Sequence, residues 1–254
     1  MGQNVGIALL LTAGAGLSTT IGGLLGLAVR GTGPRFFSFT LGFSAGVMIL
    51  VSFVELLQGS IESIGFLGAN AGFFLGMAGI FLVDNFLPHD YLGQRDRSGD
   101  ETKDNLARTA VLTAFGIGIH NFPEGMATFA STLQDIHLGS AIAVGIAIHN
   151  IPEGLAVSAP IYAATGSRRK AFLWSFLSGA SEPVGAGLGA VLLLPFLTEI
   201  VLGWVLAAVA GIMVFISLDE LIPAAKASGS EHIPILGVMA GMVVMAISVG
   251  MLKG

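Results

Sequence analysis

The sequence predicts an all-α polytopic membrane protein, built as a single transmembrane domain over residues 1–254. Hydrophobic residues make up 54% of the chain and charged residues only 11%, and the mean hydropathy is +0.85. A soluble domain of this size could not cover so much apolar surface with polar groups. The apolar residues also gather in stretches of about 20, the length that a helix needs to cross the hydrocarbon core.

Eight stretches have that length, and each is predicted to be one transmembrane helix. In chain order they are residues 5–29, 37–57, 64–86, 109–133, 138–163, 171–194, 199–222 and 233–251. The longest connection, residues 87–108, mixes acidic and basic side chains and is predicted to be a solvated cytoplasmic loop.

Positive charge tests this arrangement, because cytoplasmic loops collect Lys and Arg. Every Lys and Arg except Lys253 falls in a loop that eight spans assign to one face, namely Arg30, Arg35, Arg95, Arg97, Lys103, Arg108, Arg168, Arg169, Lys170 and Lys226. That face is therefore predicted to be cytoplasmic, and both termini are predicted to be extracytoplasmic.

An internal repeat relates the second and seventh stretches. Residues 45–57 align without a gap on residues 210–222, with Ala, Gly, Met, Ser, Glu and Leu in register. The two stretches would cross in opposite directions, which predicts an inverted repeat of spans 1–3 and 6–8 around a central pair, spans 4 and 5. Similar composition of apolar helices is the alternative explanation.

The repeat contains two acids at corresponding positions. Glu55 is predicted near the outer end of its span and Glu220 near the inner end of its own, where they would suit entrance and exit of a cation. Solvated helix ends are the alternative, and for Asp219 that alternative is the better interpretation.

The fourth and fifth stretches carry the same phrase, His-Asn-x-Pro-Glu-Gly, at residues 120–125 and 149–154. Positions four apart share a helix face, so His120 lies beside Glu124 and His149 beside Glu153. Each proline frees a backbone carbonyl, which is tolerated at membrane depth only inside protein or beside a wet cavity. The connection between the stretches is short, so the two phrases are predicted to meet near mid-membrane.

Two imidazoles and two carboxylates suit a borderline divalent ion such as Zn²⁺, with Fe²⁺, Mn²⁺ and Co²⁺ also plausible. A purely structural role for all four is the weaker interpretation, because buried ionisable groups are costly at bilayer depth. Asn121 and Asn150 add amide oxygens on a neighbouring face. Glu182, beside Pro183 in the sixth stretch, would add a third carboxylate and accommodate a second ion; a capped helix kink is the alternative.

Several function classes are disfavoured. The chain has no cysteine, hence no thiolate ligand, and no phosphate-binding G-x-x-x-x-G-K-[ST] sequence, so no ATP-binding domain is predicted in it. No nucleic-acid partner and no prosthetic group are predicted. An intramembrane zinc metallohydrolase is the competing hypothesis, although the H-E-x-x-H arrangement is absent. A proton or sodium carrier would explain the carboxylates but not the histidines.

These residues resemble the ZIP (zinc- and iron-regulated transporter-like) family, and most closely its bacterial branch. The resemblance covers essentially the whole chain. It rests on the two repeated phrases, Ser-Glu-Pro at 181–183, Asp-Glu-Leu-Ile-Pro at 219–223 and Ala-Ala-Thr-Gly-Ser-Arg-Arg at 163–169.

The resemblance implies a secondary transporter that imports Zn²⁺ and related ions (Fe²⁺, Mn²⁺, Co²⁺, Cd²⁺) across the plasma membrane, the inner membrane of a bacterium, usually as a homodimer. It also implies a binuclear centre. The first ion would be held by His120, Glu124, His149 and Glu153, and the second by Asn121, Asn150 and Glu182, with Glu124 and Glu153 bridging. In the family, the bundle of spans one, four, five and six is thought to move against the other four.

The chain departs from the family pattern at two places. Some relatives have an acid where this chain has Asn150, so the second site is expected to be less charged here. Many relatives carry a histidine run between spans three and four, where this chain has only His89, so metal sensing by that loop is not expected. His137 and His232 have no assigned role.

Overall fold

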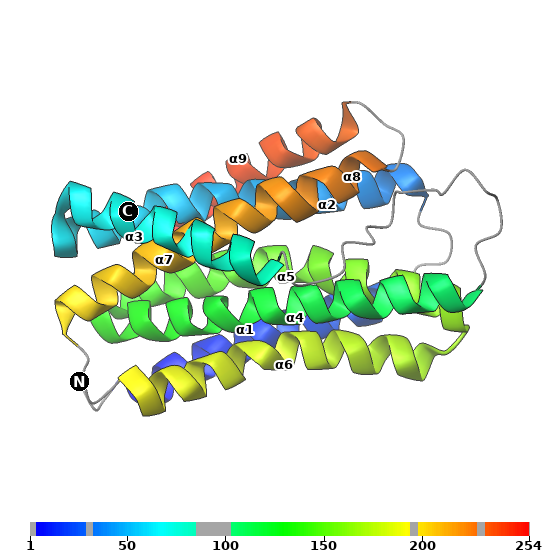
Figure 1. Ribbon diagram of the computed structural model, residues 1–254, viewed down its shortest axis with the longest axis horizontal. Helices are drawn as coiled ribbons and strands as arrows, with labels where there is room; N and C mark the ends of the chain where they lie inside the picture. Colours follow the sequence, from blue (N-terminus) through cyan, green and yellow to red (C-terminus); the bar gives the residue numbers. More distant parts are fainter. Residues whose placement is uncertain (1–3, 29–32, 85–102, 194–197, 228–231, 254) are drawn as a thin grey trace.

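The computed structural model describes residues 4–28, 33–84, 103–193, 198–227 and 232–253, and all the regular secondary structure within these ranges is helical (Figure 1). The α-helices are α1 (Val5–Ala28), α2 (Pro34–Val51), α3 (Gln58–Asp84), α4 (Lys103–Gln134), α5 (Ile136–Thr165), α6 (Arg168–Leu193), α7 (Glu199–Ile216), α8 (Ile222–Ala227) and α9 (Ile233–Lys253). Two π-helical segments, η1 (Ser52–Leu57) and η3 (Ser217–Leu221), join α2 to α3 and α7 to α8. The predicted all-α class is confirmed.

Five segments of the described chain are long and apolar enough to cross a membrane, namely Val5–Ala28, Pro34–Leu82, Ile136–Tyr162, Glu199–Lys226 and Ile233–Met251. The second segment contains two of the predicted spans, because the helix runs on through η1. It breaks only at Gly65, whose φ of 76° is a conformation that glycine adopts without a Cβ clash.

Helices α4 and α6 are also long enough to span, with 32 and 26 residues, but they are less apolar. They carry Asn121, Glu124 and Glu182, the polar residues that the predicted site needs. The described chain therefore contains several apolar helices of membrane-spanning length, as predicted, whereas the count of eight stays a prediction. Helix α4 begins at Lys103, inside the predicted connection 87–108, and most of that connection, with His89, lies outside the described residues.

The helices form two bundles (Figure 1). The first bundle consists of α1, α4, α5 and α6, which all contact one another. The second consists of α2, α3, α7 and α9, held mainly by the pairs α2–α9 and α3–α7. Contacts between the bundles are made chiefly by α2 with α5 and by α4 with α7. Every residue of the two repeated phrases lies in the first bundle.

Glycine allows close approach of helix backbones within each bundle. A Cβ on Gly46 of α2 would overlap the carbonyl of Val238 on α9, and a Cβ on Gly211 of α7 would overlap the carbonyl of Phe73 on α3. Gly46 and Gly211 are aligned in the sequence repeat. The offset along the chain from Phe73 to Val238 equals the offset from Gly46 to Gly211, so the two close contacts correspond to each other in the repeat. Such close packing is what holds helices together in lipid.

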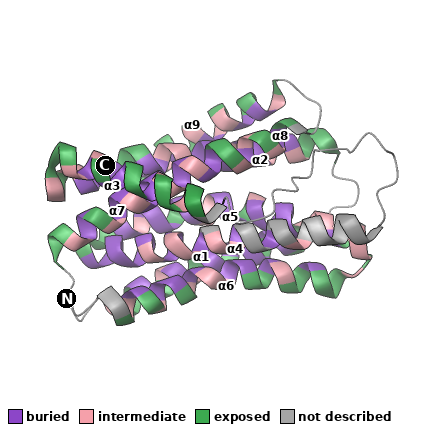
Figure 2. Cartoon of the chain, viewed as in Figure 1, coloured by how far each residue is buried: buried purple, intermediate pink, exposed green. Residues whose placement is uncertain are grey.

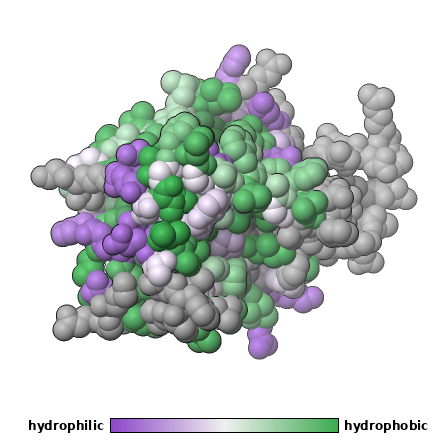
Figure 3. Space-filling view, turned by 60° about the vertical axis from the view of Figure 1, so that its left-hand side comes forward, coloured by the Kyte–Doolittle hydropathy of each residue, from purple (hydrophilic) through white to green (hydrophobic). Residues whose placement is uncertain are grey.

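Apolar and polar side chains are distributed as a membrane requires. Hydrophobic side chains cover much of the visible surface, and exposed residues lie on the outer faces of the helices (Figures 2 and 3). Leu67, Val191 and Met251 are among the most exposed large hydrophobic residues. Glu153 and Glu182, in contrast, have no exposed surface. An apolar exterior of this extent would be unfavourable in water and is favourable against lipid.

Candidate metal site

Helices α4 and α5 are joined by one residue, and this connection brings the two phrases together. α4 ends at Gln134, and the Asp135 carboxylate caps α5 by accepting a 2.8 Å hydrogen bond from the Leu138 amide. Both helices continue through their prolines, Pro123 and Pro152. The predicted antiparallel pair is therefore present, with the phrases in its interior.

The best-defined contact of the site joins the two phrases across the helix pair. Nε2 of His149 lies 3.1 Å from Oε1 of Glu124, and neither side chain is more than 1% exposed. Nδ1 of His149 lies 3.1 Å from the Gly145 carbonyl oxygen. A carbonyl can only accept, so Nδ1 carries the proton and Nε2 directs a lone pair at the carboxylate unless a cation lies between them. A proton or a metal ion can fill that place.

The spacing of this pair suits a small divalent ion. Zn²⁺ binds imidazole nitrogen and carboxylate oxygen at about 2.0–2.1 Å, which at a tetrahedral angle separates the two ligand atoms by about 3.3 Å. The observed separation of 3.1 Å needs only a slight adjustment to hold such an ion.

Asn150 of α5 and Glu182 of α6 are in contact, which brings a third helix to the site. The Asn150 side-chain amide donates to the Ala15 carbonyl at 2.9 Å and also to Oε1 of Glu182. The Asn121 amide donates to the Ser178 carbonyl at 3.2 Å. These bonds direct the Asn150 side chain toward α1 and α6 and the Asn121 side chain toward α6.

Three oxygens of this set have no hydrogen-bond partner among the described residues: Oδ1 of Asn121, Oδ1 of Asn150 and Oε2 of Glu182. All three side chains are fully buried. Buried polar atoms are rarely left unsatisfied, so each oxygen is a candidate cation ligand. The three residues that the family resemblance assigned to a second ion thus each present one such oxygen.

Glu153 is bonded from the other bundle by a residue that the sequence did not single out. Oγ of Ser44, on α2, donates to Oε1 of Glu153 at 3.1 Å and lies 3.4 Å from the His149 carbonyl. A serine in an apolar helix usually bonds its own helix, so the sequence carries no signal for this contact.

The remaining predicted ligands are placed less completely. His120 lies on α4, but its side chain is outside the part of the molecule that is described. Among the side chains that are described, no three of His, Asp and Glu come together closely enough to hold one ion. The predicted four-ligand cluster is therefore represented by the His149–Glu124 pair.

Glu55 and Glu220 lie on the two π-helical segments, η1 and η3. Glu55 is buried and lines a cavity of about 560 Å³ together with polar residues that include Gln58, Glu62, Asp135 and His137. Glu220 is half-buried. The polar lining makes the Glu55 cavity a reasonable approach for a cation.

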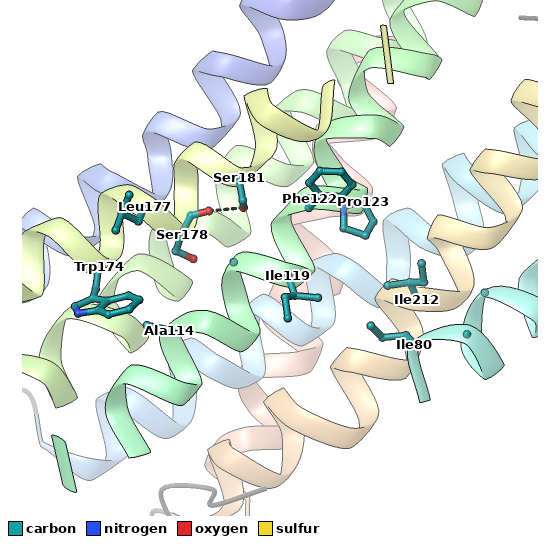
Figure 4. Close-up of a pocket in the computed structure, with 13 residues that line it drawn as sticks. Ile80, Ala114, Ile119, Phe122, Pro123, Trp174, Leu177, Ser178, Ser181 and Ile212 are labelled. Carbon is teal, nitrogen blue, oxygen red and sulfur yellow. Dashed lines mark hydrogen bonds between the residues drawn. The ribbon is translucent and has the colours of Figure 1, made fainter. Parts of the chain in front are cut away.

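A second cavity, of about 800 Å³, lies between the bundles and reaches the back of the α4 phrase (Figure 4). Ile119 and Pro123 of α4 approach it from one side and Ile80 and Ile212 from the other. Its lining is apolar apart from two serines on α6 and includes no charged side chain, so it is an unfavourable environment for a cation.

The sequence model of one protein family, described as ZIP Zinc transporter, matches residues 89–248. This chain belongs to the ZIP family. Similar ZIP proteins include the "Zinc transporter ZupT" of Chlorobium luteolum, 51% identical over 260 residues that cover 97% of this chain and 98% of the relative. Those of Clostridium perfringens and Streptococcus mutans are each 49% identical, covering 97% and 98% of this chain and 96% and 98% of the relatives.

The ZIP resemblance that the repeated phrases indicated is therefore confirmed, including its bacterial branch. Membership of this family makes the chain a multi-pass membrane transporter rather than an enzyme, and the hypothesis of an intramembrane metallohydrolase is set aside.

Proposed function

We propose that this ZIP protein imports Zn²⁺, and with it Fe²⁺, Mn²⁺, Co²⁺ and Cd²⁺, across the bacterial inner membrane into the cytoplasm. The observation that carries the proposal is the fully buried pair of His149 and Glu124, 3.1 Å apart across two apolar helices. A pair of this kind is costly at bilayer depth unless a function offsets the cost. The zinc transporters that the chain resembles support Zn²⁺ as the main cargo.

The site is proposed to be binuclear. The first ion is held by His120, Glu124, His149 and Glu153, and the second by Asn121, Asn150 and Glu182, with Glu124 and Glu153 bridging. The unsatisfied oxygens of the second set support this division. A carboxylate and two amide oxygens form a harder, less charged set than the first, so the second ion is bound more weakly.

Transport is proposed to proceed by alternating access. The first bundle carries the ligands, and the second contacts it chiefly through α2 and α7, which supports movement of one bundle against the other. The ion enters past Glu55, loses water in the cage and leaves past Glu220. The paired glycine contacts and the paired π-helical segments support an inverted repeat of spans 1–3 and 6–8 behind this movement.

The protein is further proposed to have eight spans, extracytoplasmic termini and a homodimeric assembly. The exposed basic residues at helix ends support the orientation, since Arg35 lies in the first turn of α2, Arg168 begins α6 and Lys226 lies on α8. The dimer follows the pattern of the family.

The proposal is tested by ⁶⁵Zn²⁺ uptake into proteoliposomes of purified protein. Wild type is compared with His149→Ala and, as a matched control, His232→Ala, which removes an exposed histidine outside the site. Saturable uptake lost only in His149→Ala is expected, with Fe²⁺, Mn²⁺, Co²⁺ and Cd²⁺ as competitors that rank the cargoes. Uptake no greater than in empty liposomes would refute transport of zinc.

A further inference from the structure

The contacts of α1 with α5 recur as contacts of α6 with α4. A Cβ on Gly22 of α1 would overlap the Ile151 carbonyl on α5, and a Cβ on Gly185 of α6 would overlap the Phe122 carbonyl on α4. Phe122 and Ile151 occupy the same position of the two phrases. The two helix pairs are therefore packed in the same register, with α6 in the role of α1.

Hydrogen bonds follow the same correspondence. Asn150 of α5 donates to the carbonyl of Ala15 on α1, and Asn121 of α4 donates to the carbonyl of Ser178 on α6. Each of these carbonyls also accepts from a serine three residues further along its own helix, at 2.5 and 2.6 Å. The offset along the chain from Ala15 to Ser178 equals the offset from Gly22 to Gly185. The same alignment of α1 with α6 therefore accounts for both the glycine contacts and the hydrogen bonds.

This register assigns a counterpart to Glu182. A Cβ on Gly125 would overlap the Glu182 carbonyl, and a Cβ on Gly154, at the same position of the other phrase, would overlap the Thr19 carbonyl. Thr19 therefore stands on α1 where Glu182 stands on α6. Since Asn150 bonds to Glu182, the equivalent partner of Thr19 is Asn121.

The Thr19 hydroxyl has no structural use in the described part of the protein. The residue has no exposed surface, and its Oγ1 has no hydrogen-bond partner among the described residues, nor does Oδ1 of Asn121. Its position is nevertheless fixed, because its carbonyl accepts from Oγ of Ser175 at 2.9 Å and its Cβ packs against Gly179. Two buried oxygens without partners thus lie on α1 and α4, which contact each other, at the positions that the correspondence pairs.

We propose that Thr19 is a further residue of the cation site, and that its hydroxyl holds a water ligand of the second ion beside the Asn121 amide oxygen, on the side opposite Glu182. The inference rests on the proposed function. The threonine side chain is shorter than that of glutamate, so a bound water completes the reach from the hydroxyl to the ion. The water then satisfies the Thr19 hydroxyl, and the ion satisfies the Asn121 oxygen. One side of the site is then charged and the other neutral, which keeps binding weak enough for release.

The test compares wild type with Thr19→Val, which replaces the hydroxyl by a methyl group of similar size, and with Thr19→Ser, which keeps the hydroxyl. Zn²⁺ affinity is measured by calorimetric titration of the purified protein, uptake by ⁶⁵Zn²⁺ flux, and the thermal midpoint in the absence of metal. Thr19→Val is expected to weaken binding of an ion about five- to tenfold and to raise KM, as loss of one hydrogen-bonding group would. Thr19→Ser is expected to behave as wild type.

The thermal midpoint separates this role from a structural one. Thr19→Val should melt no lower than wild type without metal, because it removes a hydroxyl that bonds to no described residue. A lower midpoint would show that the hydroxyl supports the fold and would overturn the proposal. Unchanged affinity and KM in Thr19→Val, with wild type still taking up Zn²⁺, would overturn it while leaving the proposed function intact. Failure of wild type to take up Zn²⁺ would instead refute the proposed function.

Discussion

His149 and Glu124 are in contact across two helices, with Nε2 3.1 Å from Oε1 and both side chains buried. Within one helix the spacing of four residues places His149 beside Glu153 instead. The contact thus joins the histidine of one phrase to the glutamate of the other. It exists only because α4 and α5 are packed as an antiparallel pair, so metal binding and the packing of this pair should depend on each other.

The first prediction concerns the charge of Glu124. Glu124→Gln keeps the size and a hydrogen-bonding oxygen but removes the negative charge that stabilises a cation beside His149. Zn²⁺ affinity is expected to fall at least about tenfold, the loss that removal of a charge-assisted interaction of about 1.5–3 kcal/mol produces. Calorimetric titration measures it. The control is Glu199→Gln, an exposed acid at the start of α7 and outside the cage. Equal affinity in Glu124→Gln and wild type would remove Glu124 from the ligand set.

The second prediction concerns close packing of α6 on α4. Gly185→Ala places a Cβ against the Phe122 carbonyl, whereas Gly187→Ala, on the same helix, meets no atom within 4 Å. Gly185→Ala should destabilise the protein by about 1–3 kcal/mol, the usual cost of overpacking. Gly187→Ala should be neutral or slightly stabilising, since alanine favours a helix. Unfolding of both variants in detergent decides the matter; equal stabilities would mean that the helices separate at no cost.

The third prediction concerns Ser44, which donates from the second bundle to Glu153 of the first. Ser44→Ala removes a hydrogen bond to a carboxylate, so KM for Zn²⁺ is expected to change several-fold. Ser52→Ala is the matched control, because the Ser52 hydroxyl bonds the Met48 carbonyl of its own helical run. If the two variants gave identical KM values in a flux assay, the Ser44 bond would have no part in transport.

The sequence predicts features that depend on the order of residues along one helix, but not contacts that depend on how neighbouring helices pack. The helical class, the neighbouring α4 and α5 and the candidate ligands all follow from hydropathy, from the repeated phrase and from a short connection. The contact of His149 with Glu124 and the bond from Ser44 depend on how helices pack side by side, which no periodicity encodes. A hydroxyl such as that of Thr19 gives no signal at all, because threonine in an apolar helix is explained equally well by a bond to its own backbone.

The fourth prediction concerns Glu55 and its cavity. Because this cavity is lined by acids, its field should concentrate cations at the approach to the cage. Glu55→Ala should raise KM for Zn²⁺ a few-fold while leaving the rate at saturating Zn²⁺ nearly unchanged. The effect should shrink at high ionic strength, which screens charges beyond about 10 Å at 0.1 M salt. Glu199→Ala, an exposed acid at the start of α7, is the control; a KM shift of the same size in both variants would contradict a specific approach at Glu55.

The fifth prediction concerns pH. A metal ion binds the neutral imidazole of His149 and the ionised carboxylate of Glu124, so protons and the ion compete for the same atoms. As external pH falls, protonated ligands become more frequent and KM for Zn²⁺ should rise. Because the competition is for one site, saturating Zn²⁺ should restore the maximal rate. The test is Zn²⁺ flux measured at several external pH values with a fixed internal pH. If KM stayed constant while the maximal rate fell, protons would act on the movement of the bundles and not on the ligands.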